Sequence, residues 1–137
     1  MRVLNSEAIS REVRRFRVAV GYFTRVPMGT ISGFSDGDLD HASQYLPWIG
    51  LGVGGIVAGV FWISALWLPQ VAAAVLAILA GLLLTGCFHE DGLADVCDGF
   101  GGGFTVGDKL QIMKDSRIGT YGALGILLLV LLKFFSL

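Results

Sequence analysis

The chain has 137 residues, of which 54% are hydrophobic and only 15% are charged, and its mean hydropathy is +0.71. Soluble domains carry about 25% charged residues, so a soluble protein of this length could not bury so much apolar surface. Composition therefore predicts an all-α integral membrane protein. The net charge of −1 identifies no partner.

The N-terminal region is predicted to form an amphipathic helix over residues 6–24, with Ser6 as its N-cap. Its apolar residues recur at spacings of four, three and four, which gives one helical stripe. The stripe consists of Ile9, Val13, Phe16 and Val20. Such a helix can lie on a membrane surface with its arginines at anionic headgroups. Residues 28–44 are expected to form a polar loop.

The stretch from residue 41 to residue 88 contains no Asp, Glu, Lys or Arg. As one helix rising ~1.5 Å per residue it would be about two bilayer cores long, so it is expected to fold back on itself. Pro69 divides it into two predicted spans, residues 46–68 and 71–88, which form a transmembrane hairpin. A third apolar stretch, residues 121–137, is predicted to begin a third transmembrane helix.

Glycines in the first predicted span form two G-x-x-x-G pairs, Gly50 with Gly54 and Gly55 with Gly59. This spacing lets helix backbones approach closely, although glycine is also common in membrane helices without such a role.

The distribution of basic residues predicts the orientation. Six of the ten Lys and Arg residues lie within the first 25 residues. Flanks rich in Lys and Arg stay cytoplasmic, and a hairpin returns the chain to its starting side. The loop at 89–118 is therefore expected to face the cytoplasm.

Acidic residues gather behind the second span, where six of the eleven lie between Glu90 and Asp115. Asp91, Asp95 and Asp98 are spaced by four and three residues, which places them on one face of a helix that continues the span. Three carboxylates on one face repel one another unless a cation lies between them. Hard oxygen ligands suit Mg²⁺ or Mn²⁺, so the pattern predicts a metal site. The alternative is a solvated acidic helix end.

A second helix is expected to begin near residues 105–108. Spacings of four and three residues would place Asp108, Ile112 and Asp115 on one of its faces. Two acidic helices joined by a glycine turn could then hold one or two metal ions between them.

Glycines and cations flank these carboxylates. Gly99 and Gly101 let a backbone approach a phosphate closely, or they simply form a turn. Lys114 and Arg117 lie on either side of Asp115 and can neutralise phosphate oxygens, Arg117 through a bidentate fork. Alternatively, both cations anchor the chain at the membrane edge.

These residues define the predicted site, an acidic helix-turn-helix at the cytoplasmic rim of the membrane. The expected metal ligands are Glu90, Asp91, Asp95, Asp98 and Asp115. The expected catalytic residues are Asp91, Asp95, Asp98, Asp115 and Arg117, and the expected phosphate-binding residues are Lys114, Arg117, Gly99 and Gly101. This set is typical of Mg²⁺-dependent phosphoryl or nucleotidyl transfer, in which positioning and charge neutralisation provide most of the catalysis.

Four stretches, in this order, resemble the cobalamin synthase (adenosylcobinamide-GDP ribazoletransferase) family. They are residues 23–27 (FTRVP), 47–50 (PWIG), 86–99 (GCFHEDGLADVCDG) and 112–122 (IMKDSRIGTYG). The last two are long and specific. Members of the family continue through further membrane helices. The resemblance therefore implies that residues 1–137 form a single membrane domain that is the N-terminal part of a longer one, with no turnover expected from it alone.

The resemblance implies the reaction and its partners. A hydroxyl of α-ribazole, or of its 5′-phosphate, attacks the phosphate linked to cobinamide in adenosylcobinamide-GDP, which gives adenosylcobalamin, or its phosphate, and GMP. The implied cofactor is Mg²⁺, with Mn²⁺ as an alternative. The implied location is a bacterial or archaeal inner membrane, crossed several times. A homo-oligomer is possible, and no nucleic-acid partner is expected.

Two other functions stay open at this point. A CDP-alcohol phosphotransferase of lipid synthesis also breaks a pyrophosphate by hydroxyl attack. The start of its motif fits residues 95–99, but the Ala-Arg that should follow is absent, so the identity of the catalytic base is not carried over. The other alternative is a non-enzymatic divalent-cation-binding membrane protein, although a channel should place acids inside its spans, and these spans have none.

Overall fold

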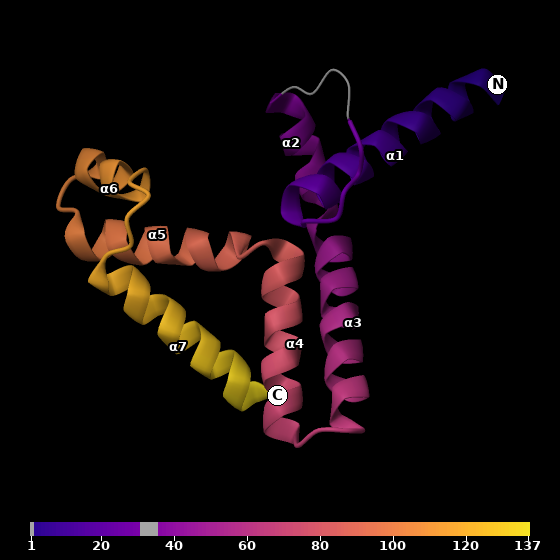
Figure 1. Cartoon of the computed structure of the whole chain (residues 1–137). Coiled ribbons are helices and arrows are strands. Elements are labelled where there is room, and N and C mark those ends of the chain that lie inside the picture. Colours follow the sequence, from indigo (N-terminus) through magenta and orange to yellow (C-terminus); the bar gives the residue numbers. More distant parts are fainter. Residues whose placement is uncertain (1, 31–35) are drawn as a thin grey trace.

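The computed structural model describes residues 2–30 and 36–137, and every regular element within them is helical (Figure 1). The elements are α1 (Arg2–Phe23), α2 (Asp36–Ala42), the 3₁₀-helix η1 (Ser43–Tyr45), α3 (Leu46–Ala65), α4 (Gln70–Thr85), α5 (Phe88–Gly102), α6 (Val106–Met113) and α7 (Thr120–Ser136). The expected all-α class is therefore confirmed for the described residues. The polar loop expected at 28–44 is partly wrong, because α2 and η1 occupy residues 36–45, while residues 31–35 lie outside the described part.

The N-terminal helix packs against α2 and the start of α3 through a small apolar core. The core residues are Val18, Ala19, Ala42 and Ile49. Arg14 adds an ion pair with Asp38 of α2, with 2.9 Å between Nη1 and Oδ1. Three residues of the predicted stripe, Ile9, Val13 and Phe16, remain exposed, which leaves an apolar side of α1 open to its surroundings, as an interfacial helix requires.

Helices α3 and α4 form an antiparallel hairpin whose turn includes Pro69 (Figure 1). The continuous helical stretch Gly37–Ala65 is the one described helix that by itself is long and apolar enough to cross a membrane. Only 6% of its most apolar window is buried, unlike the core helix of a soluble protein. Trp62 and Trp67 at its far end are 71% and 85% exposed. These features are consistent with a membrane protein.

The second predicted span ends earlier than expected, at Thr85, and the chain then bends by 85° into α5. Gly86 and Cys87 both have left-handed backbones, with φ of 64° and 60°, which interrupts the helical hydrogen-bond ladder. The expectation that the acidic helix continues the span is therefore wrong. A Cβ at Gly86 would also overlap the Arg25 side chain, so glycine is favoured at this position.

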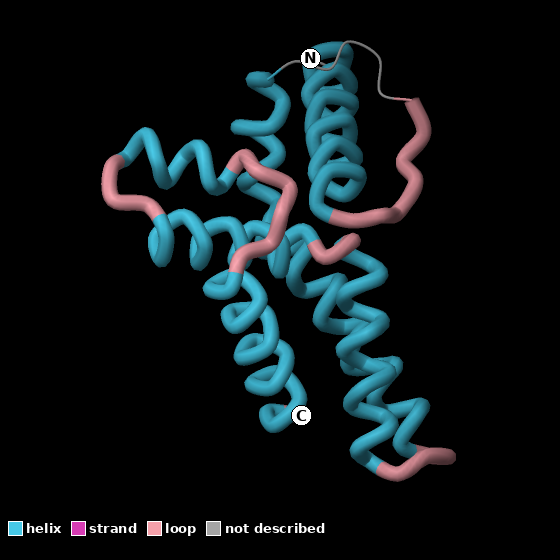
Figure 2. The backbone as a smooth tube through the Cα atoms, turned by 60° about the vertical axis from the view of Figure 1, so that its left-hand side comes forward, coloured by secondary structure: helices cyan, strands magenta, loops and turns pink. Residues whose placement is uncertain are grey.

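Helix α6 lies alongside α5, and a loop then leads into α7 (Figure 2). Its start agrees with the expected 105–108, because Thr105 and Asp108 form a capping box with hydrogen bonds of 3.0 and 3.1 Å. The helix ends at Met113, so Asp115 lies in the following loop. The predicted common helical face of Asp108 and Asp115 is therefore wrong.

Helix α7 runs back from the far end of α5 toward α4, so that α4, α5 and α7 form three sides of a triangle (Figure 1). It is apolar but has only 17 residues, which is shorter than a full candidate span. Its N-terminus meets α5, and this junction positions the candidate site.

Candidate active site

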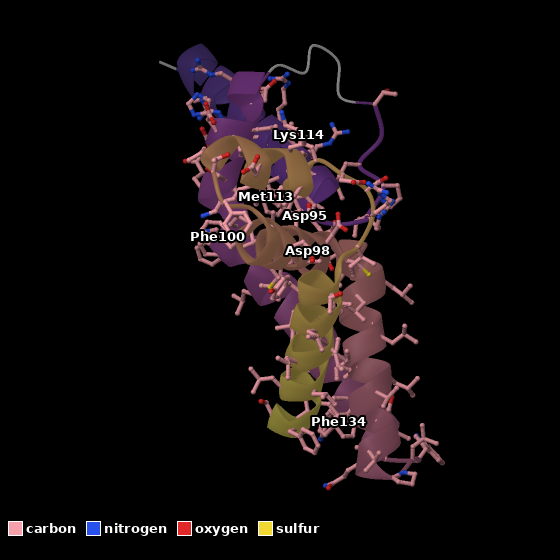
Figure 3. All side chains as sticks on the ribbon, turned by 90° about the vertical axis from the view of Figure 1, so that its left-hand side faces the viewer. Asp95, Asp98, Phe100, Met113, Lys114 and Phe134 are labelled. Carbon is pink, nitrogen blue, oxygen red and sulfur yellow. The ribbon has the colours of Figure 1, made fainter. Side chains whose placement is uncertain are left out.

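A cleft of about 290 Å³ lies between α5, the end of α6 and the loop that leads into α7. Its lining residues are Asp91, Ala94, Asp95, Asp98, Met113, Lys114, Asp115, Ser116, Arg117, Ile118 and Ile126. Six of the residues predicted from the sequence therefore meet in one place. Figure 3 shows Asp95 and Asp98 on α5, with Lys114 above them at the end of α6.

Asp98 joins α5 to the start of α7. Its Oδ2 accepts a hydrogen bond from the Gly119 amide at 2.7 Å, and its Oδ1 accepts one from the Gly122 amide at 2.8 Å. These are amides at the N-terminus of a helix, which have no partner inside the helix and favour a negative charge nearby. A Cβ at either glycine would overlap the carboxylate. Both oxygens of this buried side chain are thus used to cap α7.

Asp91 and Asp95 lie one turn apart on the same face of α5. Asp95 is half-buried and Asp91 is exposed. Within the described chain, neither carboxylate has a hydrogen-bond or ion-pair partner. Lys114 on the opposite wall also has none among these residues. The cleft thus offers two uncompensated carboxylates facing an unpaired ammonium group.

Asp115 and Arg117 form a local pair at the cleft rim. Arg117 Nη2 lies 2.7 Å from Asp115 Oδ2, and Arg117 Nε donates to the same carboxylate at 3.1 Å. These hydrogen bonds hold the pKa of Asp115 below its usual value and raise the pKa of Arg117. The Arg117 side chain is 87% exposed, so it is accessible to a ligand from solvent.

Three of the predicted site residues do not reach the cleft. Glu90 projects to another side of α5, where its Oε1 lies 2.5 Å from Nζ of Lys133, because one residue along a helix is a rotation of about 100°. Gly99 packs against Met113, where a Cβ would be too close. Gly101 lies against the Tyr121 ring in the same way. These glycines allow α6 and α7 to approach α5, and they do not contact the cleft.

The geometry limits how the chain can bind a metal ion. Among residues 2–30 and 36–137, no three His, Cys, Asp or Glu side chains lie close enough together to form a metal site. Mg²⁺, however, is commonly held by one or two carboxylates, with substrate phosphates and water completing its shell. The unpartnered carboxylates of Asp91 and Asp95 fit that mode, whereas Asp98 is already committed to α7.

Sequence reasoning missed two kinds of residue. Ser116, Ile118 and Ile126 line the cleft, and no sequence pattern singles them out. Lys133 pairs with Glu90, and here a signal existed: a lone lysine in an apolar helix needs an acidic or carbonyl partner.

These features define a class: a helical protein with membrane-type helices and an aspartate-lined cleft that also holds a lysine and an arginine. Residues 15–137 match the family model described as cobalamin-5-phosphate synthase. The chain belongs to this family.

Curated relatives carry the name adenosylcobinamide-GDP ribazoletransferase. A protein of Shewanella baltica is 53% identical over 128 residues, which cover 93% of this chain and 49% of that protein. Proteins of Shewanella putrefaciens and Shewanella oneidensis are 52% and 51% identical over the same shares. The chain thus spans about half the length of the curated relatives it matches. No solved structure matches it.

The two aspartate environments predict different effects on stability. In Asp98→Asn, an amide NH₂ replaces one acceptor oxygen and faces a backbone N–H, so we expect the free energy of unfolding to fall by about 1–3 kcal/mol. In Asp95→Asn no hydrogen bond is lost, and we expect a change within about 0.5 kcal/mol. Denaturant unfolding of the purified chain in detergent measures both. A neutral Asp98→Asn, or an equal loss in both variants, would contradict the capping role.

Proposed function

We propose that the chain supplies the aspartate-lined part of the active site of an adenosylcobinamide-GDP ribazoletransferase. The observation that carries this proposal is the 53% identity to a protein of that name over 93% of the chain. The reaction would transfer cobinamide phosphate from adenosylcobinamide-GDP to α-ribazole or its 5′-phosphate and release GMP.

The cleft residues would have different roles in this reaction. An acceptor hydroxyl attacks the phosphorus that bears cobinamide, the bond from that phosphorus to the oxygen of GMP breaks, and the hydroxyl proton must go to a base. Asp91 or Asp95 can accept that proton through a carboxylate oxygen not used for metal binding, since no hydrogen bond or ion pair from the described chain occupies these groups. Asp98 has its oxygens committed to two amides, so it would position rather than react.

Charge neutralisation comes from the opposite wall. The Lys114 ammonium group can contact non-bridging phosphate oxygens as a point charge. Arg117 can exchange its hydrogen bonds with Asp115 for a two-pronged contact with phosphate, because the pair is exposed at the rim. When bound, Mg²⁺ would supply further neutralisation of the pyrophosphate and of the departing GMP. Asp91 and Asp95 are the residues that would hold it.

We also propose that the cleft opens on the cytoplasmic side of a bacterial inner membrane. The support is the concentration of six of the ten Lys and Arg residues in the first 25 residues, together with the α3–α4 hairpin. Adenosylcobinamide-GDP and the 5′-phosphate of α-ribazole carry charged phosphates, and a site on that side would meet them without their crossing the bilayer.

The catalytic assignment predicts a specific loss of activity. Residues 1–137 would replace the matching segment of the Shewanella baltica ribazoletransferase, and GMP release from adenosylcobinamide-GDP with α-ribazole would be measured in membranes. We expect Asp95→Asn to lower turnover by about 10²-fold or more, since it removes the negative charge with which Asp95 would accept the proton or hold the metal ion.

The matched control is Asp108→Asn, which makes the same charge change in a helix cap outside the cleft. We expect it to retain turnover within about threefold, because a cap is worth only about 1 kcal/mol of stability. Equal turnover in the Asp95 and Asp108 variants would rule out the catalytic assignment.

The orientation predicts a labelling pattern in intact cells. Phe104 is 97% exposed in the loop between α5 and α6, so a cysteine placed there should react with any reagent that reaches it. In a background with Cys87 and Cys97 replaced by alanine, Phe104→Cys should react with a membrane-permeant maleimide and resist an impermeant one. Reaction with the impermeant reagent would place the loop outside the cell.

A further inference from the structure

A second concavity, separate from the aspartate cleft, lies along the α3–α4 hairpin, next to the start of α5 and the end of α7. This groove of about 450 Å³ is walled mainly by apolar residues of α3 and α4 and closed on one side by α7. Its polar lining includes the neighbouring side chains His89 and Glu90 of α5 and Lys133 of α7. The groove therefore combines an extended apolar wall with a single charged spot.

Glu90 leaves one hydrogen-bonding position in the groove unfilled. Its side chain is only 8% exposed, and Oε1 is paired with Lys133. Its other oxygen, Oε2, is buried and has no hydrogen-bond partner among the described residues. An unsatisfied buried acceptor costs about 1–3 kcal/mol, and more when the group is charged. A donor from outside the described chain would relieve that cost.

The α3 wall of the groove has space for another helix to approach closely. Gly50 and Gly54 both line the groove one helical turn apart, and no atom of the described chain lies within 4 Å of where a Cβ would stand on either. In contrast, a Cβ on Gly81 of α4 would lie only 3.2 Å from Cγ2 of Val57. Open glycines at four-residue spacing let the backbone of another helix approach closely in a membrane.

We propose that this groove receives a further transmembrane helix, which packs against Gly50 and Gly54 and donates a hydrogen bond to Glu90 Oε2 from a hydroxyl, amide or ammonium group. The curated relatives contain about as much chain again as the part matched here, since the match covers 49% of their length. That unmatched segment is the source to which we assign the helix. A lipid acyl chain would fill the apolar wall but would offer no donor to Glu90.

Co-purification tests the proposal. The whole chain with one affinity tag would be expressed in the same membranes as the unmatched segment of the Shewanella baltica ribazoletransferase with another tag. We expect the segment to co-purify in detergent with the wild-type chain. Gly54→Leu should lower its recovery about tenfold, because a leucine side chain occupies the space the helix needs.

Two further variants make the result specific. Gly55→Leu adds the same side chain one residue away, where the glycine does not line the groove, and it should leave recovery unchanged within about twofold. Glu90→Gln should also lower recovery, because its amide nitrogen replaces the acceptor oxygen. This variant keeps the shape of the side chain, so it tests the contact even if Gly54→Leu inserts poorly.

Three outcomes would overturn the proposal. The first is failure of the segment to co-purify with the wild-type chain, and the second is an equal reduction of its recovery by Gly54→Leu and Gly55→Leu. The third is that Gly54→Leu loses tightly bound phospholipid, measured by mass spectrometry, while recovery of the segment is unchanged. That result would assign the groove to lipid. None of these outcomes bears on catalysis in the aspartate cleft.

Discussion

The hydrogen bonds that Asp98 accepts from the amides of Gly119 and Gly122 tie α5 to the start of α7. A buried carboxylate is costly unless donors surround it, and the N-terminus of a helix provides both free N–H groups and a favourable dipole. The connection fixes one end of the loop that carries Asp115 and Arg117, while the end of α6 fixes the other. The cleft exists because this loop is held across from α5.

Helical periodicity gives the acidic residues of α5 three different environments. Glu90 turns into the groove and meets Lys133, Asp91 and Asp95 face the cleft, and Asp98 caps α7. Carboxylates are expensive to bury, and the two buried ones on α5 have partners: Glu90 has Lys133, and Asp98 has the amides of Gly119 and Gly122. The exposed Asp91 and the half-buried Asp95 have none within the described chain, and lack of compensation is what a cation-binding or proton-accepting role requires.

The parts of this arrangement that follow from local pattern could be predicted from the sequence. Spacings of four and three residues predicted that Asp91, Asp95 and Asp98 share one helix face, and all three line the cleft. The stretch 105–108 was expected to begin a helix, and the Thr105–Asp108 capping box marks the start of α6. The uncharged run with Pro69 indicated the α3–α4 hairpin.

The parts that depend on tertiary contacts could not be predicted in this way. A left-handed Cys87 has no sequence signature, so the 85° bend was missed, and with it the direction of α5. Nothing local distinguishes a carboxylate that binds a metal from Asp98, which accepts amides 21 and 24 residues away. Glu90 resembled its acidic neighbours until the position of Lys133 was known.

We propose that Asp91 and Asp95 bind a divalent cation together with a phosphate ligand held by Lys114 and Arg117. Electron paramagnetic resonance of Mn²⁺, titrated into the purified chain with and without inorganic pyrophosphate, measures this binding. We expect the wild-type chain to bind Mn²⁺ weakly alone and more tightly with pyrophosphate. In Asp95→Asn the affinity should be about tenfold lower, a loss of about 1.4 kcal/mol, and in Asp108→Asn it should be unchanged. Equal Mn²⁺ affinity in the wild-type chain and Asp95→Asn, with pyrophosphate present, would contradict it.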